Sequence, residues 1–204
     1  MKIVYEDKDV LAVIKPVGMP IQDDLSGDTS LLGSLSEKYK ELGLVHRLDR
    51  QVGGLVVFAK HKAATAYMNK QIATRKVEKY YYALVEGKVD HKQDILEHRL
   101  IKNAKLKKAV LDDSGKLAKL AYEVIAEFED TTLLRVKLFT GRFHQIRAQL
   151  SSVGNPIVND KKYGGKIVRG KRGIGLYSCA FNFKTSKGEV RNIAINVPDI
   201  WPFA

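Results

Sequence analysis

The stretch HRLDRQVGGLVVFAK, residues 46–60, carries the strongest indication of both fold and chemistry. Its second half contains the apolar run 55–59, whose β-branched and aromatic side chains favour a buried strand. Its first half sets one carboxylate, Asp49, between Arg47 and Arg50. Because nearby cations favour the charged form of a carboxylate even where water is excluded, Asp49 is a candidate nucleophile.

A second cationic segment, TGRFHQIR at residues 140–147, follows nearly a hundred residues later. Apolar residues recur from Phe143 to Val153 at helical spacing, which predicts a helix ending near Gly154. On that helix His144 and Arg147 share a different face from the apolar residues. We expect the two segments to meet in space, and the functional interpretation depends on that meeting.

Outward from these segments, the pattern predicts one α+β domain dominated by sheet, spanning residues 1–204, with no interdomain linker. The prolines and glycine of residues 15–20 indicate a shaped loop. Residues 112–115 carry a turn signal, and the glycine-rich segment 164–175 fits a phosphate-gripping loop or a plain surface loop. The expected elements are a hairpin over 4–14, helices over 31–42 and 61–79, strands over 80–85 and 134–138, a basic mobile excursion over 95–110, and strands over 177–183 and 190–197.

Charge narrows the choice of partners. The chain has 35 Lys and Arg against 23 Asp and Glu, a formal net charge of +12 and a pI near 9.6. Such an excess favours a polyanion, RNA or DNA, because each neutralised phosphate releases counterions. A basic solvated surface without a nucleic-acid role is the alternative.

Other sequence features exclude several classes of protein. Cys179 is the only cysteine, so no intramolecular disulfide and no zinc-finger spacing is possible. No stretch approaches the roughly 20 apolar residues that cross a bilayer. The N-terminus lacks the layout of a secretion signal. We therefore expect a cytoplasmic protein that contacts no membrane.

Four segments in order resemble RluA-type pseudouridine synthases: VIKPVGMP (13–20), HRLDRQVGGLVVFAK (46–60), KYYYALVEG (79–87) and TGRFHQIRAQLSSVGNPIVNDKKYG (140–164). The resemblance implies the catalytic fold of that family, an α+β fold with a mixed, mostly antiparallel sheet, flanking helices and a central RNA-binding cleft. It implies isomerisation of specific uridines to pseudouridine in structured RNA, ribosomal or transfer RNA. That reaction is redox-neutral, and the absence of P-loop, dinucleotide and metal-ligand motifs agrees with no metal and no small-molecule cofactor.

By position, the resemblance assigns catalytic roles to Asp49, Tyr81 and Arg147. Asp49 would attack the sugar or assist departure of the base, and family knowledge leaves that choice open. Arg147 would pair with Asp49, since guanidinium presents a planar fork to a carboxylate. Tyr81 would stack on the uracil and help to move the C5 proton. Tyr80 and Tyr82 are expected on the opposite face of the strand.

The resemblance also places residues against RNA. Arg47 would face the flipped nucleotide and its neighbours. His46 would contact RNA or form a local hydrogen bond to the strand. His144 would act as a structural hydrogen-bonding group or as an acid catalyst. Arg50 and Arg142 would bind phosphates or form salt bridges.

The chain departs from the family where Arg50-Gln51-Val52-Gly53-Gly54 replaces a commoner continuation with Thr-Ser-Gly, which puts substrate choice in doubt. We expect no S4-like RNA-binding module and a monomer, so that site selection depends on RNA shape or on the basic stretches 99–108 and 166–172. Three alternatives remain: a glycoside or nucleoside hydrolase, a non-catalytic RNA-binding protein that retains the fold, and a purely structural ion pair between Asp49 and Arg147.

Overall fold

The computed structural model describes residues 2–196 of the chain. Within that range the chain folds into two compact units. Unit 1 comprises residues 2–79 and 177–196, and unit 2 comprises residues 80–176. Among the helices in this range, none is both long enough and apolar enough to cross a bilayer.

Unit 1 is built on a sheet with the strand order β1-β2-β4-β10, in which β3 also pairs with β4 and β11 with β10. The β4–β10 pair is parallel, and the other pairs are antiparallel. The strands are β1 (Ile3–Glu6), β2 (Val10–Lys15), β3 (Gly43–Leu44), β4 (Gly53–Ala59), β10 (Leu176–Lys184) and β11 (Val190–Ala194).

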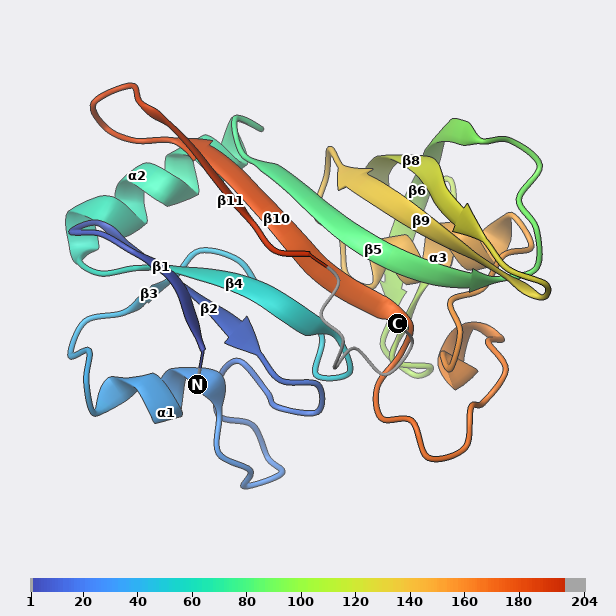
Figure 1. Ribbon diagram of the computed structural model, residues 1–204, viewed down its shortest axis with the longest axis horizontal. Helices are drawn as coiled ribbons and strands as arrows, with labels where there is room; N and C mark the ends of the chain where they lie inside the picture. Colours follow the sequence, from blue (N-terminus) through green and yellow to red (C-terminus); the bar gives the residue numbers. More distant parts are fainter. Residues whose placement is uncertain (1, 197–204) are drawn as a thin grey trace. The chain divides into compact units, whose positions relative to one another are not determined.

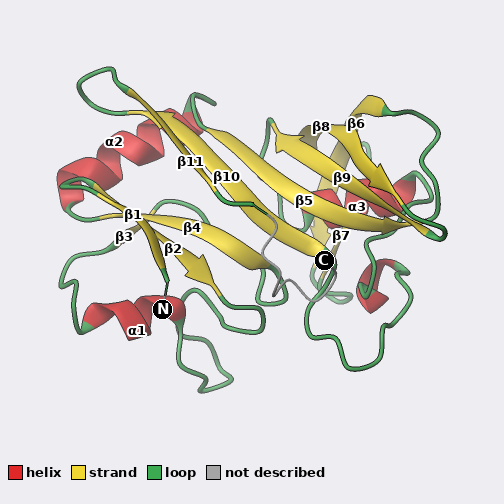
Figure 2. Cartoon of the chain, in the orientation of Figure 1, coloured by secondary structure: helices red, strands yellow, loops and turns green. Residues whose placement is uncertain are grey.

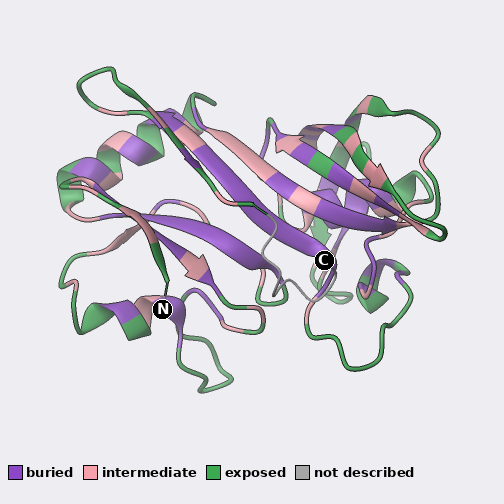
Figure 3. Ribbon diagram, viewed as in Figure 1, coloured by how far each residue is buried: buried purple, intermediate pink, exposed green. Residues whose placement is uncertain are grey.

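Two helices pack against the alternate side chains of β2 and β4. Residues Leu11, Val13, Val56 and Phe58 share one cluster with α1 (Leu31–Ser36). Residues Val10, Ala12, Leu55 and Val57 share another with α2 (Lys62–Ala73). The two helices therefore cover opposite faces of these strands, as Figure 1 shows. This is why β4 is buried along its whole length and has a continuous apolar sequence (Figure 3).

Unit 2 contains a sheet with the strand order β5-β9-β8-β6-β7, together with one α-helix and a short 3₁₀ helix (Figure 2). Pairing is antiparallel between β6 and β7, β6 and β8, and β8 and β9. The elements are β5 (Glu78–Glu86), β6 (Gln93–Asn103), β7 (Lys108–Leu111), β8 (Lys116–Glu127), β9 (Thr131–Leu138), α3 (Gln145–Ser152) and η1 (Lys161–Tyr163).

Helix α3 is tied to the sheet of unit 2 by two buried amides, those of Gln145 and Gln149. Gln149 Nε2 donates to the backbone oxygens of Leu96 and Ala118, at 3.1 and 3.2 Å. Ala148 packs beside Leu100 and Ala118 in the same small core. These contacts fix the rotation of α3 about its axis, and with it the direction in which Arg147 leaves the helix.

The predicted fold class is confirmed, since the structure is α+β with a mixed, mostly antiparallel set of strands. The hairpin at the N-terminus, the strands predicted over 55–59, 80–85 and 134–138, and the turn at 112–115 are also confirmed. A single domain over 1–204 stays a prediction. The strand predicted to end at Val197 ends at Ala194, and Val197 lies outside the described residues.

Two predicted helices are too long. The first ends at Ser36 rather than near residue 42, because Gly33 and two serines are weak helix formers. The second ends at Ala73 rather than near residue 79. Arg75 there has a positive φ of 57°, and Lys76 N donates back to Gln71 O at 2.8 Å, which terminates the helix.

The predicted mobile excursion over 95–110 is also wrong. Residues 93–111 form the antiparallel pair β6 and β7, a regular ribbon joined by a short turn. Leu96 and Leu100, four residues apart on β6, are buried on the same face of the strand. The exposed lysines that follow Leu100, at positions 102, 105 and 107, hid the strand pattern.

Candidate active site

Asp49 is half-buried on the loop that joins β3 to β4 in unit 1. Its backbone oxygen accepts a hydrogen bond from Val52 N at 3.0 Å, which closes a turn directly after the carboxylate-bearing residue. Gly54 has φ of +113°, and a Cβ there would lie 2.2 Å from Ser178 O of β10. Only glycine fits this position, so the loop returns to the sheet at a fixed point.

The buried ammonium of Lys15 holds the backbone beside Asp49. Lys15 Nζ donates to Pro16 O, Met19 O and Arg50 O, at 2.9, 2.8 and 3.2 Å. These bonds tie the loop after β2 to the residue that follows Asp49. Burial lowers the pKa of Lys15 to about 8, and the negative charge of Asp49 opposes that shift. Lys15 is therefore a cation of unit 1 that interacts electrostatically with Asp49, and the sequence interpretation did not assign it a role.

Arg50 forms salt bridges within the protein. Its Nε donates to Gly18 O at 2.9 Å, and its Nη1 donates to Ser26 Oγ at 2.9 Å and pairs with Asp24 at 3.5 Å. Its Nη2 pairs with Asp28. Of the two roles considered for Arg50, these contacts favour the salt bridge over phosphate binding.

His46 hydrogen-bonds to the strand, the second of the two roles considered for it. Its Nε2 accepts from Val57 N at 3.0 Å, and its ring stacks on Phe181 with centroids 4.8 Å apart. Burial, and then the charge of Lys79, lower the pKa of His46 to about 3, so the ring is neutral near pH 7. A neutral, half-buried imidazole is poorly suited to bind phosphate, whereas the neighbouring Arg47 is exposed.

Arg147 lies on α3 in unit 2 and forms a buried bidentate ion pair with Asp160. The Nε–Oδ2 distance is 2.6 Å and the Nη2–Oδ1 distance is 2.8 Å. The two side chains are only 5% and 1% exposed. The sequence interpretation predicted Asp49 as the partner of Arg147 and missed Asp160, which lies in the quoted signature 140–164. Pairing with Asp49 stays a prediction.

His144 is the N-cap residue of α3, with a left-handed backbone at φ 49°. Its Nδ1 lies 3.0 Å from the Tyr163 hydroxyl, which also accepts from Ala109 N at 2.6 Å. The His144 ring stacks on Phe143, with centroids 3.8 Å apart. These contacts favour the structural role for His144 over the role of an acid catalyst.

Arg142 is also engaged with backbone. Its Nε donates to Leu117 O of β8 at 2.9 Å, and its own N–H donates to Gln145 Oε1 at 3.0 Å. Gln145 in turn receives a hydrogen bond from Thr140 Oγ1 at 2.8 Å. The segment 140–145 is thus held against β8, and Arg142 is an anchor of that segment.

Tyr81 is buried on β5, whereas Tyr80 and Tyr82 are half-buried on the alternate positions. Arg135 and Lys137 of β9 lie over the Tyr80 ring, at 4.8 and 5.5 Å from its centroid. Tyr81 thus points to the other face of the strand from Tyr80 and Tyr82, as predicted.

Exposed lysines gather along the β6–β7 ribbon and the adjoining 3₁₀ helix. Lys162 Nζ donates to Lys107 O at 3.0 Å, which ties η1 to the ribbon turn. We call this surface the lysine ribbon; it comprises Lys102, Lys105, Lys107, Lys161 and Lys162. The second predicted basic stretch, 166–172, is a loop, and Asn159 Nδ2 braces it through Gly173 O at 2.6 Å.

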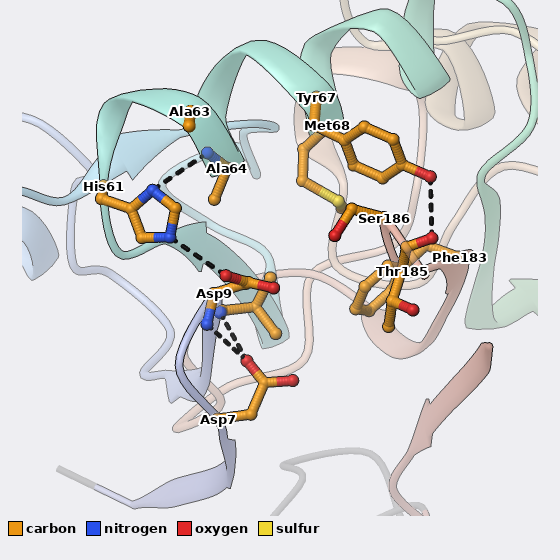
Figure 4. Close-up of a pocket in the computed structure, with 11 residues that line it drawn as sticks. Asp7, Asp9, His61, Ala63, Ala64, Tyr67, Met68, Phe183, Thr185 and Ser186 are labelled. Carbon is orange, nitrogen blue, oxygen red and sulfur yellow. Dashed lines mark hydrogen bonds and ion pairs between the residues drawn. The ribbon is translucent and has the colours of Figure 1, made fainter. Parts of the chain in front are cut away.

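A separate pocket in unit 1 lies between α2 and the β10–β11 turn (Figure 4). Its polar groups pair with the protein itself. His61 bridges Ala64 N and Asp9 at 3.2 and 3.0 Å, and Tyr67 Oη donates to Thr185 O at 2.9 Å. This pocket contains none of the predicted site residues. In residues 2–196, no three His, Cys, Asp or Glu side chains are placed to hold a metal ion.

Within unit 1 the structure thus gathers His46, Arg47, Asp49 and Arg50 on one loop beside Lys15. Within unit 2 it gathers Arg142, His144 and Arg147 at the start of α3, and Tyr81 lies on β5 of the same unit. Sequence interpretation missed Lys15, Asp160 and Tyr163. The available signals were a lysine at the end of an apolar strand, VLAVIK, and an acid and a tyrosine in NDKKYG.

Comparisons with a family model and with curated proteins point to the same family. Residues 9–152 match the family described as RNA pseudouridylate synthase. The "Dual-specificity RNA pseudouridine synthase RluA" of Vibrio vulnificus is 37% identical over 177 residues, 79% of this chain and 68% of that protein. An "Uncharacterized RNA pseudouridine synthase" of Aquifex aeolicus is 35% identical over 180 residues, 81% of this chain and 57% of that protein.

Solved structures agree on the fold. "Human RNA Pseudouridylate Synthase Domain Containing 1" superposes with a TM-score of 0.84 at 24% identity, over 97% of this chain and 83% of that one. The chain spans little more than half the length of the first curated relatives that it matches, 57% and 53%. On the match over residues 9–152 and the 37% identity to the Vibrio vulnificus protein, of which 68% is covered, the chain belongs to the RNA pseudouridylate synthase family.

Proposed function

We propose that this chain converts specific uridines of folded RNA to pseudouridine. The observation that carries the proposal is family membership together with an intact Asp49 that lies beside a buried cation, Lys15. In the reaction the N1–C1′ glycosidic bond breaks, the uracil turns, and a C5–C1′ bond forms. The proton on C5 leaves and N1 gains one, so that the product is an isomer of the substrate.

Asp49 is the proposed group at the ribose. It either attacks C1′ or stabilises the cation left when uracil departs. Lys15 supports either role, because it places a buried positive charge that interacts with the Asp49 carboxylate. Tyr81 is proposed to stack on the uracil and to help remove the C5 proton.

Arg147 is the proposed partner of the Asp49 carboxylate. The side-on pair with Asp160 uses the Nε proton and one Nη2 proton. A guanidinium has five donor protons, so three lie outside this pair. A carboxylate at those donors would be held in one rotamer, as transfer at a sugar carbon requires.

The target uridine must leave its helix, at a cost of about a few kcal/mol. We propose that the exposed Arg47 holds the flipped nucleotide through stacking and phosphate contact. The lysine ribbon is proposed to bind RNA phosphates elsewhere on the substrate, in keeping with the net charge of +12. Ribosomal or transfer RNA is the proposed substrate class. A monomeric state, a cytoplasmic location and the absence of a cofactor stay predictions.

The test is incubation of the wild type and of Asp49→Ala with total RNA that lacks modified uridines, followed by mapping of pseudouridine. We expect sites with the wild type and none with Asp49→Ala. Asp130→Asn removes an exposed carboxylate at the β8–β9 turn and serves as the matched control.

Each alternative predicts a different product. Free uracil in the supernatant would identify a hydrolase. RNA binding without any pseudouridine, tested on both ribosomal and transfer RNA, would identify a non-catalytic binding protein and overturn the proposal.

A further inference from the structure

The Arg147–Asp160 ion pair is deeply buried. Both side chains are almost completely withdrawn from water. Removing two charges from water costs nearly as much as their attraction returns, so an apolar pair of similar size would stabilise the fold equally well. What the ion pair adds is direction, since two parallel hydrogen bonds fix the guanidinium plane.

The ion pair with Asp160 fixes one edge of the Arg147 guanidinium, and the Tyr163 ring packs against one of its faces. Nε and Nη2 point to Asp160, at 2.6 and 2.8 Å. The Tyr163 ring lies with its centroid 5.0 Å from Arg147 Cζ. Because the guanidinium is planar and rigid, this also sets where its opposite edge points.

Asp160 is itself held by a rigid turn. Its N–H donates to Ile157 O at 3.1 Å, and its backbone oxygen accepts from the N–H groups of Tyr163 and Gly165, each at 2.9 Å. A Cβ on Gly165 would lie 2.0 Å from Ile157 O, so the turn closes only with glycine. The carboxylate therefore has little freedom to follow Arg147 if the arginine moves.

Tyr163 connects this turn to two other elements. Its hydroxyl accepts from Ala109 N of β7 at 2.6 Å and lies 3.0 Å from Nδ1 of His144 at the start of α3. The turn that holds Asp160 is thus fastened to the ribbon and to the helix that carries Arg147. Three elements of unit 2 support one guanidinium.

We propose that Asp160, braced by Tyr163, is the positioning residue of Arg147 and sets the orientation in which the guanidinium meets the catalytic carboxylate. This inference rests on the proposed function, in which Arg147 pairs with Asp49. Asp160 acts through Arg147 and does not touch the substrate.

The test compares wild type, Asp160→Asn and Asp160→Glu. The substrate is an in vitro transcript that carries a uridine identified by the pseudouridine mapping of the proposed-function test. Asparagine is isosteric but accepts only through one oxygen, so Arg147 loses its side-on partner. We expect kcat to fall about 10²-fold, the size of effect that a small misplacement of a catalytic group produces. KM should stay near the wild-type value, because no RNA contact is removed. Asp160→Glu restores the charge and should recover part of kcat.

A double-mutant cycle separates positioning from general stability. If Asp160 acts through Arg147, Asp160→Asn should add almost nothing to the loss of kcat caused by Arg147→Lys. Independent, additive losses would overturn the inference. Asp130→Asn is the control for removing an acid from unit 2. If Asp160→Asn does not fold, the kinetics of Asp160→Glu are measured instead, at a temperature below the melting point of that variant. A lower kcat at constant KM supports the inference, and a wild-type kcat overturns it.

The outcomes distinguish this inference from the proposed function. Wild-type activity with an unchanged kcat in Asp160→Asn overturns the inference alone. Absence of pseudouridine with the wild type overturns both.

Discussion

Asp49 and Arg147 are held in place by different physical means. In unit 1, Asp49 lies on a loop, and the cation that acts on it, Lys15, is bonded to three neutral carbonyl oxygens. In unit 2, Arg147 projects from helix α3 and forms an ion pair with the carboxylate of Asp160. The lysine has a pKa lowered to about 8, so it loses its proton as the pH rises through that value. The arginine stays charged at every accessible pH. Unit 1 therefore carries a cation whose charge depends on pH, and unit 2 carries one whose charge does not.

The largest expected effect comes from breaking the buried pair. Arg147→Met leaves the Asp160 carboxylate buried beside an apolar side chain, and we expect a loss of about 3–5 kcal/mol in the free energy of unfolding. Replacing both residues, with Arg147→Met and Asp160→Leu together, should recover most of that loss, since no charge is then stranded. Denaturant unfolding of the three proteins measures both steps. A loss below about 1 kcal/mol in Arg147→Met would show that the pair is far better solvated than its 5% and 1% exposures indicate.

The next effect is a dependence of stability on pH that Lys15 brings to unit 1. Its pKa is about 8 in the folded protein, below the ordinary value of 10.5. Between these values the unfolded chain binds more protons than the folded one, so the free energy of unfolding rises as pH increases. The whole shift corresponds to about 3 kcal/mol. Catalysis should respond in the opposite sense, because deprotonation removes the cation that acts on Asp49.

The measurement is the difference in unfolding free energy between wild type and Lys15→Met at several values from pH 7 to 10.5. Subtraction removes other groups that titrate in this window, such as Lys79, whose pKa burial also lowers. As the pH rises above 8, the unfolding free energy of the wild type should increase relative to that of Lys15→Met. A difference that is constant across the window would contradict the titration of Lys15.

Tyr163 allows a smaller test within unit 2. Tyr163→Phe keeps the ring against Arg147 but removes the hydroxyl that Ala109 N donates to at 2.6 Å. A buried N–H without an acceptor costs on the order of 1–3 kcal/mol, and we expect a loss of unfolding free energy in that range. Hydrogen exchange should show the Ala109 amide as the site of faster exchange. Unchanged protection at Ala109 would mean that the hydroxyl does not hold the ribbon to the turn.

Much of the fold could be predicted from the sequence where one physical signal dominates. The apolar run 55–59 needed burial on both faces, and it is β4. The predicted helix ends were wrong where apolar periodicity and helix propensity disagreed. Tyr39 and Leu42 pack with the apolar cluster of α1 although they are not helical. An apolar periodicity therefore continued beyond the end of the helix, and only the weak helix propensity around Gly33 contradicted it.

The candidate site was predictable in its charged residues but not in their supports. Motif position pointed to Asp49, Tyr81 and Arg147. Arg147 and Asp160 are thirteen residues apart, and nothing in the spacing says that a turn brings the acid under the helix. Lys15 stands in a strand, where a charged side chain is normally expected in solvent. Its burial depends on three carbonyl groups of loops whose shapes the sequence does not give.

Arg50 gives the smallest expected effect and the sharpest contrast with Arg147, because it is the same side chain paired with carboxylates in water. Arg50 and its partner Asp24 are 41% and 44% exposed, and Asp28 is 56% exposed. Such pairs contribute about 0–1 kcal/mol, since water screens the charges and ordering the side chains costs entropy. Arg50→Gln should therefore change the free energy of unfolding by less than about 1 kcal/mol, and less still at high salt. Denaturant unfolding at low and high salt measures it beside Arg147→Met. Because both substitutions remove one guanidinium, a loss in Arg50→Gln as large as that in Arg147→Met would mean that burial is not what separates the two arginines.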